Sequence, residues 1–188
     1  MKLYILRHED RTQDCSFFSP LTKEGLNNSI KLIDILKKKK INIIYSSPYI
    51  RTLQTIYPYS LKQNIKINLE YGLGEIQHSD IIAKKSTGLY IPEYIAESFN
   101  YNKKYKSIIQ PSDINYPETV SDIDFRVKQI LKNILTQYIN TDNIILLVTH
   151  QSLCSIIAKI HDKEYEINYT TGLLCKVYDN NFLCVKVN

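Results

Sequence analysis

Arginine and histidine side chains follow three short apolar segments of the chain, at the points where those segments end. Arg7 and His8 come directly after the first segment, Arg51 lies just beyond a later one, and His150 closes the last. If these segments are strands of one open α/β sheet, ligands bind just beyond their carboxyl ends. Positive side chains gather at such an edge only where an anion offsets their mutual repulsion. The spacing therefore predicts an anion-binding site that contains two histidines.

The strands that would carry these residues are short runs rich in isoleucine and leucine. They cover residues 2–7, 41–46, 65–69 and 144–149. The first, second and fourth runs are almost continuously apolar, which is typical of strands buried on both faces of a parallel sheet. Two further strands, 172–178 and 182–187, flank Asp179-Asn180-Asn181, and this turn chemistry predicts a terminal hairpin.

Helices are expected between these strands. They cover 22–40, 49–62 and 119–138, and a fourth follows His150. Apolar residues recur about one turn apart at Leu26, Ile30, Ile33 and Leu36 in the first helix, and at Ile123, Val127, Ile130, Ile134 and Tyr138 in the third. Strands that alternate with helices predict a three-layer α/β/α sandwich with a mostly parallel central sheet of about six strands.

The length of 188 residues predicts one domain over 1–188. Residues 76–118 do not follow the alternation, because they contain three prolines and several polar clusters. We interpret them as an insertion or lid with short helices, lying over one end of the sheet.

The net charge of +5 favours anionic partners such as phosphate esters. No stripe of lysine and arginine interleaves with aromatics, so no nucleic-acid partner is expected. The longest apolar run, 144–148, is far shorter than the roughly 20 residues that span a bilayer, so no membrane partner is expected either. The four cysteines lack metal-binding spacing, which favours a reduced, cytoplasmic location. Strand-like sequence begins at Lys2, so no signal peptide is expected.

Five short motifs occur in order along the chain. They are "RHE" at 7–9, "PLTKEG" at 20–25, "SSPYIRTLQT" at 46–55, "EYGLGE" at 70–75 and "VTH" at 148–150. Together they resemble the "RHG", "PLTxxG", "SSPxxRxxQT", "ExGLxE" and "VxH" elements of the histidine phosphatase, or phosphoglycerate mutase-like, superfamily. The resemblance covers about residues 2–160 and implies a phosphoglycerate mutase-like fold.

The resemblance also implies a role for each matching residue. His8 matches the nucleophile that takes the phosphoryl group as phosphohistidine, and it must be neutral to attack. Arg7, Arg51 and His150 match the catalytic phosphate pocket, where the planar fork of arginine suits phosphate oxygens. Glu75 matches the general acid that protonates the leaving oxygen and then activates water. No cofactor and no metal are implied.

Two other glutamates are candidates for the role of general acid besides Glu75. Glu70 lies five residues earlier, but the "GLxE" match selects Glu75, and the alternative interpretation of Glu70 is an exposed charge at a strand end. Glu118, in "PETVSD", resembles the "GES" element that precedes a long helix in the superfamily. That element makes structural or pocket-rim contacts, so Glu118 is not predicted to be catalytic.

Arg11 extends the first motif to "RHEDR", which is similar to the "RHGER" pattern of one phosphatase branch. This branch includes ecdysteroid-phosphate phosphatases and the phosphatase domain of the T-cell ubiquitin-ligand proteins. There the arginine joins the phosphate pocket. A solvated loop residue is the alternative for Arg11. His78, three residues after Glu75, could reach the cleft or could be a loop histidine, and His161 is interpreted as a surface residue.

Two positions depart from the superfamily pattern. Glu9 replaces the usual glycine after the nucleophile, and Gln151 replaces a small residue after His150. A carboxylate 4–6 Å from a bound phosphate would repel it by about 1–4 kcal/mol, depending on the local dielectric. Glu9 could instead turn away and pair with a lysine or arginine.

The leading hypothesis is a metal-independent phosphomonoester phosphatase that acts through phosphohistidine on His8. A phosphoglycerate mutase and a weakly active module that binds a phosphorylated ligand are the alternatives. The expected substrate is a phosphorylated small molecule or a phosphoprotein. An edge strand near the C-terminus could pair with a second copy, so a homodimer is among the expectations.

Overall fold

The computed structural model describes residues 1–78, 89–138, 140–160, 173–178 and 181–186, with the backbone alone from 158 onward. Six strands form one sheet in the order β3-β2-β4-β1-β5-β6. Their bounds are β1 Lys2–Arg7, β2 Ile43–Ser46, β3 Ile67–Leu69, β4 Ile144–Thr149, β5 Leu173–Tyr178 and β6 Asn181–Lys186. The first four strands of the chain run parallel to one another, and β5 and β6 are antiparallel to their neighbours. The predicted mostly parallel sheet is confirmed, although 179–180 of the expected turn lie outside the described residues.

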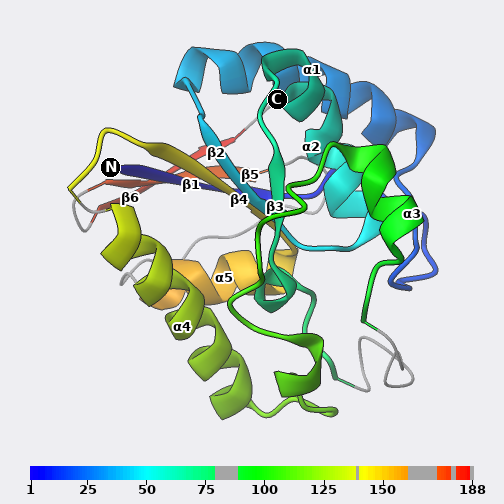
Figure 1. Ribbon diagram of the computed structural model, residues 1–188, viewed down its shortest axis with the longest axis vertical. Helices are drawn as coiled ribbons and strands as arrows, with labels where there is room; N and C mark the ends of the chain where they lie inside the picture. The colour runs from blue at the N-terminus through cyan, green and yellow to red at the C-terminus, as the bar shows by residue number, and fades with distance from the viewer. Residues whose placement is uncertain (79–88, 139, 161–172, 179–180, 187–188) are drawn as a thin grey trace.

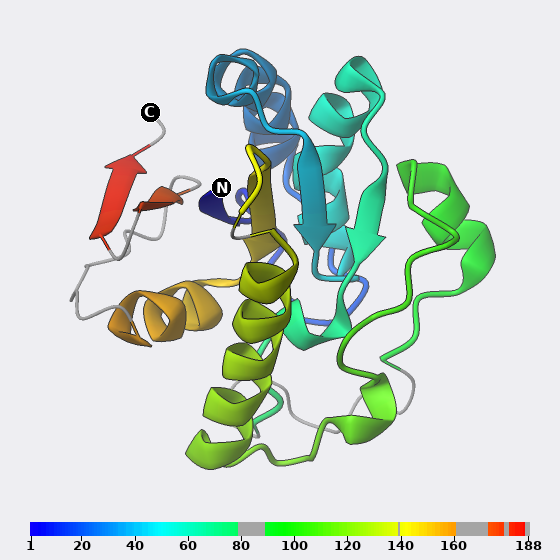
Figure 2. The same cartoon turned by 60° about the vertical axis from the view of Figure 1, so that its left-hand side comes forward.

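Helices cover both faces of this sheet, as Figures 1 and 2 show. The helices α1 (Lys23–Lys39) and α2 (Ile50–Gln63) lie on one face, and α4 (Val120–Tyr138) and α5 (Gln151–Ile160) lie on the other. This arrangement is the predicted three-layer sandwich. None of the described helices is long and apolar enough to cross a membrane.

The register of the parallel strands brings their carboxyl ends to one edge. Arg7 pairs with Thr149 across β1 and β4, and Ser46 pairs with Val148 across β2 and β4. The next residue of each strand, His8, Ser47 or His150, therefore emerges at the same edge of the sheet. This is the edge at which ligands bind in open α/β sheets.

The start of α1 is held against the loop that follows His8. Thr22 caps the helix by accepting a hydrogen bond from the Gly25 amide, and the Thr22 amide donates to the Asp10 carbonyl at 3.0 Å. A Cβ atom at Gly25 would lie only 2.1 Å from that carbonyl oxygen. The glycine of the "PLTKEG" motif therefore permits a close approach of helix and loop.

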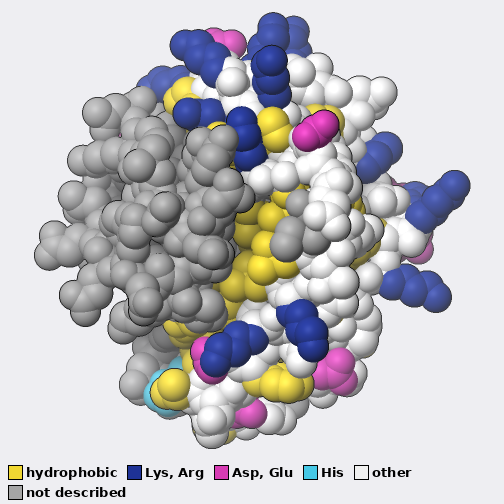
Figure 3. Space-filling view, turned by 90° about the vertical axis from the view of Figure 1, so that its left-hand side faces the viewer, with side chains coloured by type: hydrophobic (Ala, Val, Ile, Leu, Met, Phe, Trp, Pro, Cys, Tyr) yellow, Lys and Arg dark blue, Asp and Glu magenta, His cyan; other side chains and the backbone are white. Residues whose placement is uncertain are grey.

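The predicted apolar face of α1 is partly wrong. Leu26 and Ile30 are 42% and 60% exposed, whereas Leu32 and Leu36 are buried. Apolar residues lie all around this helix, so spacing alone did not select the face in contact with the protein. The lysines of the last turn complement the helix dipole. Figure 3 shows Lys and Arg side chains gathered at the end of the molecule where α1 lies. In α4, by contrast, Ile123, Val127, Ile130 and Ile134 are buried as predicted, and Tyr138 is half-buried.

The described part of the 76–118 segment contains the short helices α3 (Glu93–Ala96), η2 (Glu97–Phe99) and η3 (Pro111–Asp113). Part of it lies beside the sheet rather than over its end. Tyr101 forms a parallel bridge with Ile67, and backbone bonds join Ile67 to Asn100 and Asn102. The segment thus covers the outer edge of β3, which protects the backbone of that strand from pairing with other chains. Residues 79–88 lie outside the described residues.

The interpretation of Glu70 as an exposed charge is wrong, because its side chain is completely buried. Its carboxyl group accepts hydrogen bonds from the Gly72 amide, two side-chain hydroxyls and two further amides, at 2.6–3.2 Å. The other donors are Tyr105, Ser107, Ile108 and Ile109. Glu70 therefore anchors the 105–109 segment to η1 (Tyr71–Leu73), the turn that precedes Glu75.

Replacing Glu70 with alanine is expected to lower the free energy of unfolding by about 3 kcal/mol or more, since several buried donors would lose their acceptor. Urea unfolding followed by circular dichroism measures this loss. Glu93→Ala is the control, because Glu93 is an exposed carboxyl group of the same segment and its loss should change stability by less than about 0.5 kcal/mol. A loss below about 1 kcal/mol for Glu70→Ala would contradict the anchoring role.

Candidate active site

His8 is buried at the end of β1, and one of its ring nitrogens is fixed by the backbone. Its Nδ1 lies 2.7 Å from the Glu9 carbonyl oxygen. Because a carbonyl only accepts hydrogen bonds, Nδ1 carries the proton and Nε2 keeps its lone pair. The backbone contact therefore selects the tautomer that can attack an electrophile through Nε2.

The "SSPYIRTLQT" motif supports the loop around His8 from the start of α2. Thr55 Oγ1 donates to the Arg51 carbonyl at 2.7 Å and accepts from the Glu9 amide at 3.0 Å. Gln54 Oε1 accepts from the Leu21 amide at 2.7 Å. These contacts connect the loop after β1, the helix α2 and the chain before α1 around His8.

Arg51 is buried beside the two histidines. Its Nη1 donates to the Ser16 carbonyl at 2.8 Å, and its guanidinium lies 4.5 Å from the centre of the Tyr49 ring. Burial lowers the pKa of Arg51 to about 10, and the Glu75 carboxyl group opposes this effect. The side chain is therefore still charged at neutral pH. Among the described residues, Arg51 Nε has no hydrogen-bond partner, so this buried donor remains for an anion.

His150 and Glu75 face each other next to His8. The two imidazole rings meet edge to face with centres 5.3 Å apart. His150 Nε2 lies 2.9 Å from Ser47 Oγ, while Nδ1 lies 3.7 Å from Glu75 Oε2 and has no hydrogen-bond partner among the described residues. The free Nδ1 and the half-buried Glu75 carboxyl group are thus both beside the proposed nucleophile.

Arg7 and Arg11 complete the positive cluster. Both are half-buried, and the charge of each lowers the pKa of His8. Arg11 also donates to the Thr12 carbonyl at 2.6 Å and to Cys15 Sγ at 2.8 Å. These contacts hold Arg11 close to the site rather than in solvent. The structure therefore brings together all six of the predicted site residues: Arg7, His8, Arg11, Arg51, Glu75 and His150.

Both histidines are electrostatically biased toward the neutral form. Burial is the main cause that lowers the pKa of His8 well below its usual value of 6.5, and the Arg51 charge adds to it. Burial, Arg51 and then His8 lower the pKa of His150 in the same way. A neutral His8 is the form that can act as a nucleophile at neutral pH.

These shifts predict how stability depends on pH. The unfolded chain binds protons at the two histidines below pH about 6.5, whereas the folded chain does not until a lower pH. The free energy of unfolding is therefore expected to fall as the pH drops below about 6.5, by roughly 1 kcal/mol per pH unit for each histidine. Urea unfolding between pH 5 and 7.5 measures the slope. The double variant His8→Gln/His150→Asn should show a shallower slope, and an unchanged slope would contradict this origin.

Glu9 is buried, and both its backbone carbonyl and its backbone amide form hydrogen bonds in the site. Its carbonyl orients the His8 ring and its amide donates to Thr55 Oγ1. The residue that departs from the superfamily pattern therefore provides the backbone carbonyl that orients the His8 ring. Gln151 is the first residue of α5, and its side chain is half-buried.

The family model of the histidine phosphatase superfamily (branch 1) matches residues 6–171. The chain belongs to this superfamily. Comparison with curated proteins found no significant match.

Several solved structures share this histidine phosphatase fold. The ecdysone phosphate phosphatase from Bombix mori, in complex with tungstate, matches with a TM-score of 0.74 and 14% identity over 98% of this chain and 91% of that one. The alpha-ribazole phosphatase from Shigella flexneri matches with a TM-score of 0.63 and 16% identity over 100% and 96%. A phosphoglycerate mutase from Bacillus anthracis matches with a TM-score of 0.64 and 18% identity over 100% and 92%. At these identities the likeness establishes the fold alone.

Several residues of this histidine phosphatase site were not predicted. Ser47, which bonds to His150, lies inside the recognised "SSPYIRTLQT" motif and could have been assigned from it. Gln77 and Arg126 have no such signal, because their partners lie far away in the sequence. His78 is half-buried just after Gln77 and its role stays a prediction, and His161 lies outside the described residues.

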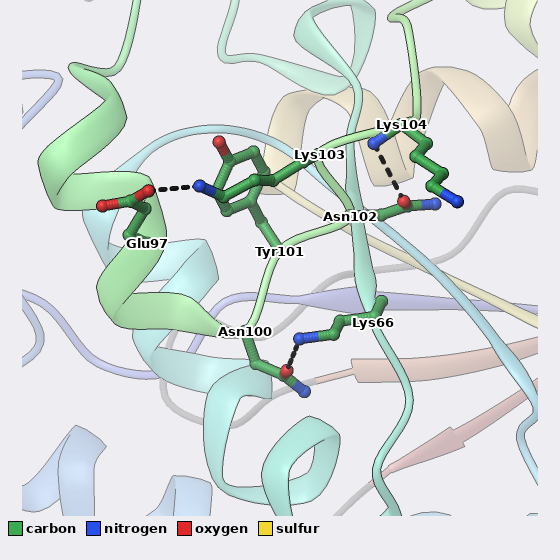
Figure 4. A pocket seen from close by; sticks show the side chains of 7 residues that line it. All are labelled: Lys66, Glu97, Asn100, Tyr101, Asn102, Lys103 and Lys104. Atoms are coloured by element: carbon green, nitrogen blue, oxygen red, sulfur yellow. Dashed lines mark hydrogen bonds and ion pairs between the residues drawn. The ribbon is translucent and has the colours of Figure 1, made fainter.

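Two other features of the described residues do not point to a further ligand site. Within the part of the chain that the structure describes, no group of three or more histidine, cysteine, aspartate or glutamate side chains could hold a metal ion. A surface hollow of about 470 Å³ near the start of β3 contains three lysines, as Figure 4 shows. Lys66 donates to Asn100 at 2.6 Å and Lys103 pairs with Glu97, and none of the site residues lines the hollow.

Proposed function

We propose that this protein is a phosphomonoester phosphatase that works through a phosphohistidine on His8 and needs no metal ion. The observation that carries the proposal is the fixed tautomer of His8. The bond from Nδ1 to the Glu9 carbonyl leaves Nε2 free, in a site where burial and nearby guanidinium groups keep the ring neutral. Such a ring is a nucleophile aimed at an anionic substrate.

In the first step, Nε2 of His8 attacks phosphorus and the bond from phosphorus to the ester oxygen breaks. Arg7, Arg11 and Arg51 bind the non-bridging oxygens and stabilise their charge, as a metal ion does in other phosphoryl-transfer enzymes. His150 contributes in the same way through Nδ1 in the tautomer in which Nδ1 carries the proton and Nε2 accepts from the Ser47 hydroxyl. Glu75, in its protonated form, gives its proton to the leaving oxygen, so that an alcohol or a phenol departs.

In the second step, water attacks the phosphorus of phosphohistidine. Glu75, now a carboxylate, takes a proton from the water, and the phosphorus–nitrogen bond breaks with its electrons returning to Nε2. Inorganic phosphate is released and His8 is neutral again. Glu75 therefore ends the cycle protonated and ready for another substrate.

The test is phosphate release from an aryl phosphate in the presence of EDTA, together with analysis of the phosphoenzyme. Release without added metal is expected, with a phosphoenzyme that is labile to acid and stable to base. An acid-stable phosphoenzyme would exclude His8 as the nucleophile. Release that requires an added divalent cation would contradict the metal-independent mechanism.

The phosphoglycerate mutase among the matching structures makes mutase activity the second candidate. A mutase retains its phosphoryl group and excludes water, so it would interconvert 2- and 3-phosphoglycerate much faster than it hydrolyses either one. A module that only binds phosphorylated ligands would bind vanadate tightly and release no phosphate. The same preparation distinguishes these outcomes from the proposed phosphatase.

A further inference from the structure

The backbone just before Glu75 is held by buried side chains from distant parts of the chain. The Gly72 and Gly74 carbonyls accept hydrogen bonds from Arg126 Nη1 at 2.7 and 2.9 Å. The Leu73 carbonyl between them accepts from Thr149 Oγ1 at 2.7 Å. Three consecutive carbonyls are thus fixed immediately before the proposed general acid.

The backbone after Glu75 is held by the partner of Arg126. Glu118 Oε2 accepts from the Gln77 amide at 2.8 Å, and the Glu118 amide donates to the Gln77 carbonyl at 2.7 Å. Two parallel bonds of 2.8 Å join the Glu118 carboxyl group to Nε and Nη2 of Arg126. One bidentate ion pair therefore forms hydrogen bonds with the backbone on both sides of Glu75.

Hydrogen bonds and a ring contact connect this ion pair to the residues around His8. Gln77 Nε2 donates to the carbonyl of Glu75 at 3.0 Å and to the Tyr49 hydroxyl at 2.8 Å. The Tyr49 ring in turn packs edge to face against His150, with ring centres 4.7 Å apart. The position of the Glu75 backbone is thus tied to the residues around His8.

The ion pair is almost inaccessible to solvent, with side chains only 4% and 1% exposed. A buried ion pair is weak evidence for a stabilising role, because removing two charges from water offsets much of their attraction. Apolar side chains at positions 118 and 126 could fill the same space in the core. Apolar side chains, however, could not donate to the Gly72 and Gly74 carbonyls or accept from the Gln77 amide.

We infer that Glu118 and Arg126 are positioning residues that hold Glu75 in reach of the leaving oxygen. This inference rests on the proposed function, in which Glu75 is the general acid. It predicts that loss of either side chain impairs proton transfer specifically, since a displacement of about 1 Å at a reacting group costs about 10²-fold in rate. Binding of the phosphoryl group, which depends on the arginines near His8, should be preserved.

The experiment compares two aryl phosphates with the variants Arg126→Lys and Glu118→Gln. Phenyl phosphate has a poor leaving group that needs the acid, whereas 2,4-dinitrophenyl phosphate has a good one that does not. We expect kcat/KM for phenyl phosphate to fall by about 10²-fold, and kcat/KM for the dinitrophenyl ester to fall by less than about fivefold. Vanadate inhibition constants should stay within about twofold of wild type.

A second readout separates positioning from general damage to the fold. If Arg126 acts through Glu75, then Arg126→Lys added to Glu75→Gln should cause little further loss on phenyl phosphate. Leu32→Ala, a core variant in α1, is the stability control. It should not change the ratio of kcat/KM for phenyl phosphate to kcat/KM for the dinitrophenyl ester. Glu118→Gln carries the same test if Arg126→Lys does not fold.

The outcomes are distinguishable. The positioning role would be overturned if kcat/KM fell equally for the two substrates. It would also be overturned if the fold-losses of Arg126→Lys and Glu75→Gln multiplied in the double variant. Either result would leave the phosphatase proposal intact. Wild-type protein that releases no phosphate from either ester would overturn the proposed function itself, before any variant is compared.

Discussion

His8→Ala is expected to lower kcat/KM for an aryl phosphate by about 10⁵-fold, the scale of loss seen when a covalent nucleophile is removed. The reason is geometric as well as chemical. Nε2 of His8 is the ring nitrogen left free by the Glu9 carbonyl, and burial together with the Arg51 charge keeps this ring neutral. Phosphate release is the measurement, with single-turnover assays at high enzyme concentration to detect residual activity.

The matched control for His8→Ala is anion binding. Arg51 and its neighbours remain in the variant, so vanadate or inorganic phosphate should still bind with an affinity within about tenfold of wild type. Preserved binding together with lost turnover would assign a chemical role to His8. A variant that retains more than a few per cent of wild-type turnover would show that another group is the nucleophile.

Arg51→Met is expected to lower kcat/KM by about 10³-fold, because it removes a buried guanidinium from the developing charge of the transition state. It should also change the pH profile. After burial, the Arg51 charge is the strongest influence that lowers the pKa of His8. Without it the pKa of His8 rises, His8 is protonated at a higher pH, and the acid limb of kcat/KM moves upward. Rates measured from pH 4 to 8 test this shift.

Arg51→Lys distinguishes the effect of the positive charge of Arg51 from the effect of its planar guanidinium group. Lysine keeps the positive charge, so the acid limb should stay near its wild-type position, but it lacks the planar fork that binds two phosphate oxygens. The rate should therefore still fall. If the acid limb does not move in Arg51→Met, the charge of Arg51 does not control the protonation of His8.

The strands and the superfamily motifs could be predicted because their signals are local. Apolar runs gave the buried parallel strands, and the strand ends delivered Arg7, His8 and His150 to one edge, as the register confirms. The α/β sandwich follows from the same alternation. Residues within one motif share a short stretch of backbone, so their spacing already determines much of their geometry.

The errors and omissions concern contacts between distant segments. A glutamate at a strand end is usually solvated, and only the donors at 105–109, more than 30 residues later, explain the burial of Glu70. Arg126 occupies a helix whose apolar face was correctly predicted, yet its side chain is buried because it reaches carbonyls from another segment. The face of α1 was misjudged because exposed isoleucine and leucine mimic a core-facing pattern.

The hydrogen bonds from Arg126 and Thr149 to the chain before Glu75 also bear on the order in which the protein becomes active. These contacts join residues 52 to 76 positions apart in sequence. β4 lies between β1 and β2 in the sheet, so formation of the sheet brings together the elements that carry His8 and Arg51, whereas the chain before Glu75 is secured only when α4 has also docked. A chain whose sheet has formed but whose α4 has not docked should therefore bind anions before it can hydrolyse esters. Recovery of turnover during refolding would then report the docking of α4 rather than the formation of the sheet.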